Sequence, residues 1–371
     1  MIKAPEIQNQ KSKIPKTAMA AGTTSTAASA AAVFGQALPK LVVFVNDKFA
    51  LENRFAPDGA AFRHMDIVRD FTLRFGDLLL GVYSFDLVGQ LPQEAVFHIA
   101  SLDSRGIKPQ FVEALLKSWI MAIECLVKRD AADQLIPAVQ QLLKQLPALY
   151  QQLQQPPQGL PVEVQPFFDL LMAKNRKFAA EHILSRIRDG ASIESVYADI
   201  LLPALERMRL LWLQNKVSAV DERAADDISR YVILRVMDSI FGERRFPFRA
   251  LVACMPGEQE ALDVEVFANF LEIKGWSVYF LGSDVSDEDI MYAIMKNSPQ
   301  AVVLSVSSIA GLPAARRLIA QVREKYTQIK LAVHGRAALL AREWLTSEVN
   351  LFIGGLEQGH SELLKKVLPD A

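Results

Sequence analysis

The chain has 371 residues, of which 51% are hydrophobic and 22% charged, and its formal net charge is −1. A chain of this length holds two or three domains. The near-neutral charge argues against direct nucleic-acid binding, and no run reaches the roughly 18 apolar residues of a membrane span. The two cysteines, Cys125 and Cys254, both lie in apolar runs, which indicates buried thiols and a reducing, cytoplasmic compartment.

The first part of the chain divides into an arm and a helical region. Residues 1–38 are rich in Lys, Thr, Ser and Ala, and are expected to be a disordered arm. Residues 39–153 predict an all-helical sensor or partner-binding domain. In it, Leu41–Val45 is a strand or a packing segment, Pro137 and Pro147 interrupt the last helix, and Trp119 is a core residue.

Two histidines of this helical domain, His64 and His98, deserve two interpretations. Either could bind the iron of a haem or another tetrapyrrole, as in a helical sensor. Surface or satisfied core positions are the commoner situation for a single histidine.

A Pro-rich linker at residues 154–161 precedes a second helical region at residues 162–246. Its apolar spacing predicts a four-helix bundle. The expected helices are Phe167–Arg188, Ser192–Leu213 with a split near Pro203, and Ser218–Phe241. Ser192 and Ser218 are the candidate N-caps.

Residues 247–371 alternate between apolar runs and amphipathic helical segments. The runs that predict strands are Ala250–Met255, Ser277–Leu281, Ala301–Ser307, Ile329–His334 and Val349–Gly354. Five such units indicate an α/β fold with a flavodoxin-like parallel sheet, whose ligands lie at the carboxyl ends of the strands. The loops at Pro256–Glu260, Ser305–Ser308 and His334-Gly335 are therefore the candidate site.

These loops resemble those of the cobalamin-binding superfamily, which includes methionine synthase, corrinoid methyl carriers and light-sensing cobalamin regulators. The family has Gly-Asp-x-His-x-x-Gly after its first strand, Ser or Thr after the third and Gly-Gly after the fourth. Here the first motif begins Gly257-Glu258-Gln259-Glu260, so Glu260 stands at the position of the cobalt-binding His. Ser305 keeps the Ser position, Ser307 and Ser308 follow it, and His334-Gly335 replaces Gly-Gly.

The preceding bundle resembles the family's helical cap, which carries a Trp, nine intervening residues and Glu-His. Trp212 and Glu222 match this pattern, and Arg223 replaces the His. Trp212 would face a bound corrin or would be a core residue. A carboxylate such as that of Glu260 is a poorer axial ligand for cobalt than imidazole, so His334 and His182 are alternative ligands and Arg336 could pair with an anionic group.

The resemblance implies a cobalamin-binding-like domain whose cofactor is cobalamin, with haem or no cofactor as the alternatives. Because both family histidines are replaced, we expect a non-enzymatic sensory or regulatory protein that acts through a protein partner, as an anti-repressor or a signalling adaptor. The alternative is a corrinoid carrier subunit of a methyltransferase. A closed pocket, filled by Gln259, Leu262 or Phe267, would leave only a scaffold. Formation of a homo-oligomer is left open.

Overall fold

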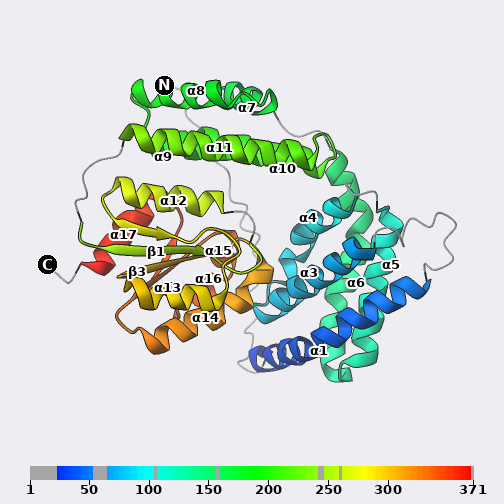
Figure 1. Cartoon of the computed structure of the whole chain (residues 1–371). Coiled ribbons are helices and arrows are strands. Elements are labelled where there is room, and N and C mark those ends of the chain that lie inside the picture. The colour runs from blue at the N-terminus through cyan, green and yellow to red at the C-terminus, as the bar shows by residue number, and fades with distance from the viewer. Residues whose placement is uncertain are drawn as a thin grey trace, which may run out of the picture.

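The computed structural model describes residues 23–52, 65–103, 107–155, 159–240, 246–258 and 261–368 (Figure 1). Its centre is one five-stranded parallel sheet with the order β2-β1-β3-β4-β5. The strands are β1 (Arg249–Cys254), β2 (Ser277–Phe280), β3 (Ala301–Ser305), β4 (Lys330–His334) and β5 (Leu351–Ile353). The flavodoxin-like α/β fold predicted from the five apolar runs is therefore confirmed.

Helices cover both faces of the sheet because its strands alternate two sets of apolar side chains. On β1, Ala250, Val252 and Cys254 face the core beneath α12 (Leu262–Ile273) and α17 (Leu356–Val367). The alternate residues Leu251 and Ala253 face the opposite core. That core includes α13 (Asp287–Asn297), α14 (Leu312–Lys325), α15 (Arg336–Leu340) and α16 (Arg342–Leu345).

A helical bundle lies over α12, as Figure 1 shows in green. It consists of α7 (Gln165–Met172), α8 (Arg176–Arg188), α9 (Ile193–Val196), the π-helical turn Tyr197–Leu201, α10 (Leu202–Leu213) and α11 (Ala219–Ile240). Its core includes Leu262 and Val266 of α12, so the bundle and the sheet domain are packed together.

Two of the predicted bundle helices are divided into shorter elements in the structure. The single helix expected over Phe167–Arg188 is two helices, because Lys174 has a left-handed φ of 53° and Asn175 caps α8 through its side chain. The helix expected over Ser192–Leu213 is divided close to Pro203, as predicted, because α10 begins at Leu202 and Pro203 lies in its first turn, where a missing N–H costs little. The π-helical turn Tyr197–Leu201 lies directly before α10 and joins it to α9.

The N-terminal region forms a third helical unit. Its helices are α1 (Thr23–Glu52), α3 (Met65–Ser84), α4 (Leu91–Asp103), α5 (Pro109–Leu126) and α6 (Arg129–Gln154), with a short 3-10 turn at Val88–Gln90. Trp119 is fully buried in it, as expected. This helical unit shares one continuous hydrophobic core with the lower face of the sheet.

Several expectations for this region are wrong. Residues 23–38 belong to α1, where Phe34 and Leu38 are buried, so this part of the expected arm is helical. Of the two alternatives expected for Leu41–Val45, the packing segment is confirmed, since it lies in the same helix. Pro137 and Pro147 lie within the continuous α6, because both face solvent while the opposite side of the helix packs into the core.

Cys125 is exposed, contrary to the expectation of a buried thiol, whereas Cys254 is buried. In the part of the chain that is described, one helical stretch, Ser29–Glu52, is long and apolar enough to cross a membrane. The same stretch supplies Phe34, Leu41 and Val45, all fully buried, to the protein core. In this stretch, 33% of the most apolar window is buried inside the protein.

Candidate functional site

The carboxyl ends of β1, β3 and β4 meet at one edge of the sheet. The strand register places Cys254 beside Ser305 and Ser305 beside His334. The loops that follow are joined by backbone hydrogen bonds: Met255 N donates to Ser305 O (3.1 Å), and Val306 N donates to His334 O (2.8 Å). The three loops that the sequence singled out therefore form one continuous surface.

Glu258 links the first loop to the second. Its residue is only 6% exposed, and its Oε1 accepts hydrogen bonds from the backbone N–H groups of Ser307 and Ser308. The N–H of Gly257 donates to Asp284 Oδ1 at 2.7 Å, which ties the same loop to the end of β2. Glu258 therefore shapes the site by holding the loop after β3, which is a positioning role.

The three serines of the loop after β3 lie in different environments. Ser305 is 1% exposed and its side chain hydrogen bonds with that of Cys254. Burial, followed by the charge of Glu258, raises the pKa of the Cys254 thiol to about 12, so this sulfur is protonated at neutral pH. Ser307 and Ser308 are half-buried at the surface, and Ser308 Oγ accepts from Ala310 N.

The space between α12 and the end of β4 is filled with side chains. The ring of Phe267, fully buried, stacks on His334 with centroids 6.3 Å apart. Across from it, a Cβ on Gly359 would lie 2.8 Å from Ile353 Cγ2 and 3.0 Å from Phe267 Cε2. Phe267 is one of the three side chains expected to fill this slot, and its ring occupies the space between α12, β4 and α17.

His334 points into this filled slot. Burial lowers its pKa to about 4, so the imidazole is neutral at neutral pH, and its buried Nδ1 has no hydrogen-bond partner. The next residue, Gly335, has a φ of 100°, and a Cβ there would lie 2.7 Å from Val306 O. Only glycine allows this close approach of the two loops.

Arg336, at the start of α15, is paired within the chain. Its guanidinium donates to Glu94 Oε1 of α4, across 242 residues of sequence. The Glu94 side chain is 8% exposed and that of Arg336 is 56% exposed. Arg336 was expected to pair with an anionic group of a ligand, but in the structure it pairs with a carboxylate of the N-terminal helical region.

Trp212, the cap residue of the sequence motif, lies near the end of α10 and also contacts α4. Its ring is 5.7 Å from that of Phe97, and the Arg209 guanidinium lies 4.9 Å from the Phe97 centroid. Nearby, Asn215 donates to Asp103 at 2.8 Å. The sequence offered no signal for Glu94 or Phe97, because contacts between distant segments appear only after folding.

The remaining candidates are spread out. Glu222 and Arg223 lie in the first turns of α11, with Glu222 half-buried and Arg223 exposed. Gln259, Glu260 and His64 lie outside the described residues. Leu262 packs into the bundle core and not into the slot.

Two other histidines considered as ligands, His98 and His182, do not reach the strand ends. His98 stacks edge-on against Phe71 and Phe97, and burial, followed by the nearby Arg74, lowers its pKa to about 4. His182 lies on α8, which packs on α11 and is separated from the sheet by it (Figure 1). Within the described ranges, no group of three or more His, Cys, Asp or Glu side chains is arranged to hold a metal ion.

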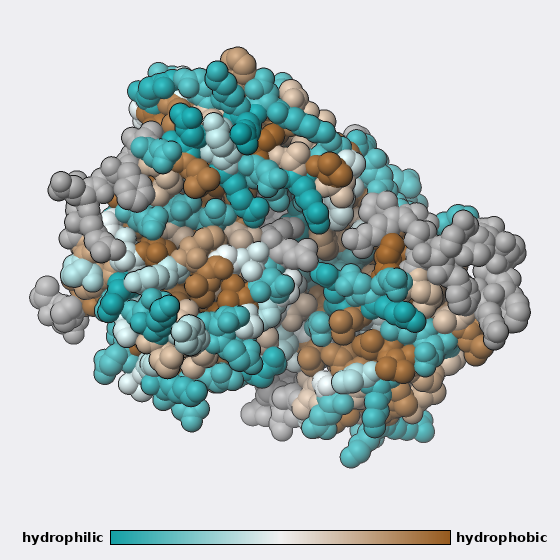
Figure 2. All heavy atoms as spheres, in the orientation of Figure 1, coloured by the Kyte–Doolittle hydropathy of each residue, from teal (hydrophilic) through white to brown (hydrophobic). Residues whose placement is uncertain are grey.

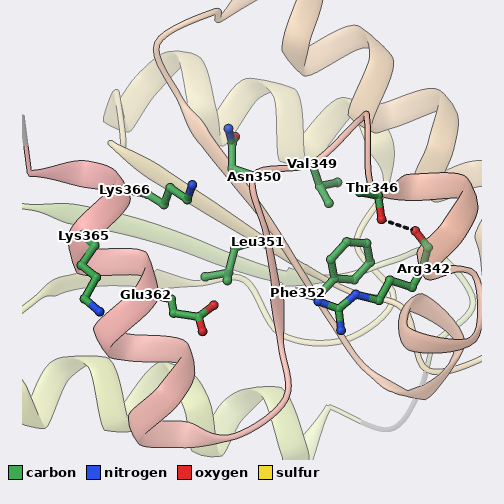
Figure 3. A pocket seen from close by; sticks show the side chains of 9 residues that line it. All are labelled: Arg342, Thr346, Val349, Asn350, Leu351, Phe352, Glu362, Lys365 and Lys366. Carbon is green, nitrogen blue, oxygen red and sulfur yellow. Dashed lines mark hydrogen bonds between the residues drawn. The ribbon is translucent and has the colours of Figure 1, made fainter.

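A separate pocket of about 490 Å³ lies along β5 (Figure 3). In the close-up, Lys366 from α17 and Arg342 from α16 flank Leu351 and Phe352 of the strand. The guanidinium of Arg342 lies 5.0 Å from the Phe352 centroid. None of the residues predicted for the site lines this pocket, so it is a separate feature.

The fit of cobalamin to these residues can be judged from the filled slot. A corrinoid whose nucleotide tail enters between α12 and β4 does not fit, because Phe267, His334 and the close contact at Gly359 occupy that space. Above the strand ends, α4 contacts Trp212 and Arg336, so a ligand can reach only those parts of the two side chains that α4 leaves exposed.

Residues 248–362 match the family model for the B12 binding domain. No curated protein matches the chain. Among solved structures, the monomethylamine corrinoid protein of Methanosarcina barkeri is 11% identical, with a TM-score of 0.48, covering 55% of this chain and 97% of its own.

Two further structures are more distant in shape. A cobalamin-binding protein from Desulfitobacterium hafniense is 12% identical (TM-score 0.30, covering 56% of this chain and 100% of its own). The methanol:cobalamin methyltransferase complex MtaBC from Methanosarcina barkeri is 14% identical (TM-score 0.29, covering 57% and 87%). By its sequence match and its five-stranded parallel sheet, the carboxy-terminal domain at residues 248–362 belongs to the B12 binding domain family.

Proposed function

We propose that the chain is a non-enzymatic sensory or regulatory protein, of the anti-repressor or signalling-adaptor type, that acts through contact with another protein. One observation carries this proposal. Helix α4 of the N-terminal region contacts both the cap residue Trp212 and the strand-end residue Arg336. These contacts support a coupling between the ligand face and the N-terminal helical region, which in this proposal signals to the partner.

The same contacts disfavour the alternative, a corrinoid carrier subunit. A carrier must present the upper face of its corrin to a separate catalytic subunit. Here α4 of the same chain contacts Trp212 and Arg336, which would hinder that access. The side chain closing the slot, Phe267, and the replacement of the family's axial His by Glu260 also oppose a redox-cycling cobalt site.

The ligand that we propose is cobalamin held without the usual His ligand and without insertion of its tail, or another tetrapyrrole such as haem. The B12 binding domain at residues 248–362 supports this class of ligand. The partner is a regulatory protein, and the exposed apolar surface of the N-terminal helices supports such a contact. Figure 2 shows this surface gathered over α1 and α3, whose exposed apolar residues include Val43, Leu51 and Leu73.

Two measurements on the purified chain test the proposal. The first is an absorption spectrum after incubation with hydroxocobalamin, methylcobalamin, adenosylcobalamin or haem, in the dark and in light, followed by desalting. The second is an assay of methyl transfer from methylcobalamin to homocysteine or another thiol. We expect no methyl transfer, and a retained corrin or Soret band would identify the ligand.

Methyl transfer by the chain would refute the regulatory proposal and would favour a carrier subunit. If no chromophore is retained and no partner is captured by the helical region, the sensory assignment also fails. A light-dependent spectral change would narrow the function to photosensing.

A further inference from the structure

We infer that α4 is an internal mimic of the ligand: Glu94 and Phe97 occupy the positions that an anionic group and a flat ring of the bound ligand would take. The inference rests on the proposed function, because it concerns the same strand-end face. It adds the chemical class of the ligand, a planar ring system bearing a carboxylate or phosphate, and the competition that regulates its binding.

The first step of the argument is the spacing on α4. Glu94 and Phe97 are three residues apart and therefore lie on one side of the helix. Ala95 and Ile99 point away from that side and are buried in the N-terminal core. The side that faces the bundle and the sheet thus presents one carboxylate and one aromatic ring, about one helical turn apart.

The second step is the partner of each group. Glu94 pairs with Arg336, which lies just beyond the carboxyl end of β4, where ligands of such sheets bind. The Phe97 ring contacts two side chains of α10: its centroid is 5.7 Å from the ring of Trp212 and 4.9 Å from the guanidinium of Arg209. An arginine for an anion, together with a tryptophan and a second arginine around a flat ring, forms a receptor for a planar aromatic anion.

The third step is that a ligand can replace α4 in its contacts with Arg336 and Trp212. The Arg336 side chain is 56% exposed and that of Trp212 is only half-buried, so both can be reached by a ligand. A ligand that takes Arg336 from Glu94 and Trp212 from Phe97 replaces contacts of the same chemistry. Its apparent affinity is reduced by the fraction of molecules in which α4 occupies the face.

The test uses the full-length chain and protoporphyrin IX, a planar ring with two carboxylates, with its dimethyl ester as the matched neutral probe. Binding is followed by porphyrin fluorescence. The double variant Glu94→Gln/Phe97→Ala should bind protoporphyrin IX at least about tenfold more tightly than the native chain, because the internal competitor is removed. Adding Arg336→Gln should abolish most of that gain.

The control variant, Glu113→Gln/Phe178→Ala, makes the same two chemical changes at exposed sites on α5 and α8, away from the proposed receptor. It should bind like the native chain. Exchanging the charges, as Glu94→Arg/Arg336→Glu, should restore the pair and keep porphyrin binding weak, and circular dichroism would verify that each variant is folded.

Equal affinity of the native chain and the Glu94→Gln/Phe97→Ala variant would overturn the inference, as would equal binding of the acid and its dimethyl ester. Either result would leave the methyl-transfer assay unaffected, so a failure of the mimic can be distinguished from a failure of the regulatory proposal. Stronger binding of hydroxocobalamin than of protoporphyrin IX by the double variant would overturn the assignment of a planar aromatic ligand.

Discussion

Two parts of the strand-end surface are closed in different ways. Between α12 and β4, Phe267 belongs to the hydrophobic core of the sheet domain, and its ring stacks on that of His334. Above the strand ends, α4 contacts Trp212 and Arg336 through partly exposed side chains. Opening the first closure requires core side chains to unpack. At the second closure, a ligand of the same chemistry can replace α4 in its contacts.

The largest effect on stability is expected from a substitution that removes the ring filling the first closure, between α12 and β4. Phe267→Ala should lower the free energy of unfolding by about 3–5 kcal/mol, because it leaves a cavity beside His334. If the side chain alone closes the slot, the variant should also retain more hydroxocobalamin after desalting. Phe178→Ala on α8, where the ring is 60% exposed, should change stability by less than about 0.5 kcal/mol. Equal stability losses in the two variants would contradict a filled core at this position.

Acidification should also act on the first closure. His334 has a pKa of about 4 in the folded protein and an ordinary value near 6.5. The unfolded chain therefore binds more protons between these values, and stability should fall as the pH drops from about 6.5 to 4. In His334→Gln this loss should be smaller by up to about 3 kcal/mol at pH 4. The check is chemical denaturation of the native chain and of His334→Gln at a series of pH values, with pH 7 as the reference. If the unfolding free energies of the two proteins change in parallel with pH, His334 does not contribute.

The anchoring of the N-terminal region is the third test. A Cβ on Gly81 of α3 would lie 2.1 Å from the backbone oxygen of Ile309 in the loop after β3. Gly81→Ala should destabilise the protein by about 2–3 kcal/mol, because backbone must move. Gly89→Ala, where a Cβ would meet nothing within 4 Å, is the matched control. Similar thermal unfolding of both variants would show that α3 is not held firmly against the sheet domain.

The smallest effects on stability are expected at the second closure, where α4 contacts the sheet domain. The two partners of the Glu94–Arg336 ion pair should contribute unequally. Arg336→Gln leaves the buried Glu94 carboxylate without its cation and should cost about 1–2 kcal/mol. Glu94→Gln leaves a guanidinium that is already 56% exposed and should cost less than about 1 kcal/mol. Urea unfolding of both variants checks the order, and the reverse order would place the buried end of the pair at Arg336.

The fold of the carboxy-terminal domain could be predicted because each strand has a continuous apolar run and each helix has its own periodic stripe. Short-range patterns of this kind depend on neighbours in sequence. Prediction was poorer at prolines and at the N-terminus. Pro137 and Pro147 look like helix breakers, yet they face solvent in α6, and burial of the opposite side stabilises the helix.

The strand-end loops were likewise identified from sequence, since the carboxyl ends of parallel strands lie at one edge. The sequence by itself thus determined the sheet, the bundle and which loops meet at the strand ends. Only the tertiary structure decided that Phe267 closes the slot and that Glu94 and Phe97 lie opposite Arg336 and Trp212. These contacts join residues more than 60 positions apart, and their pairing depends on how whole helices pack, which no local pattern of residues records.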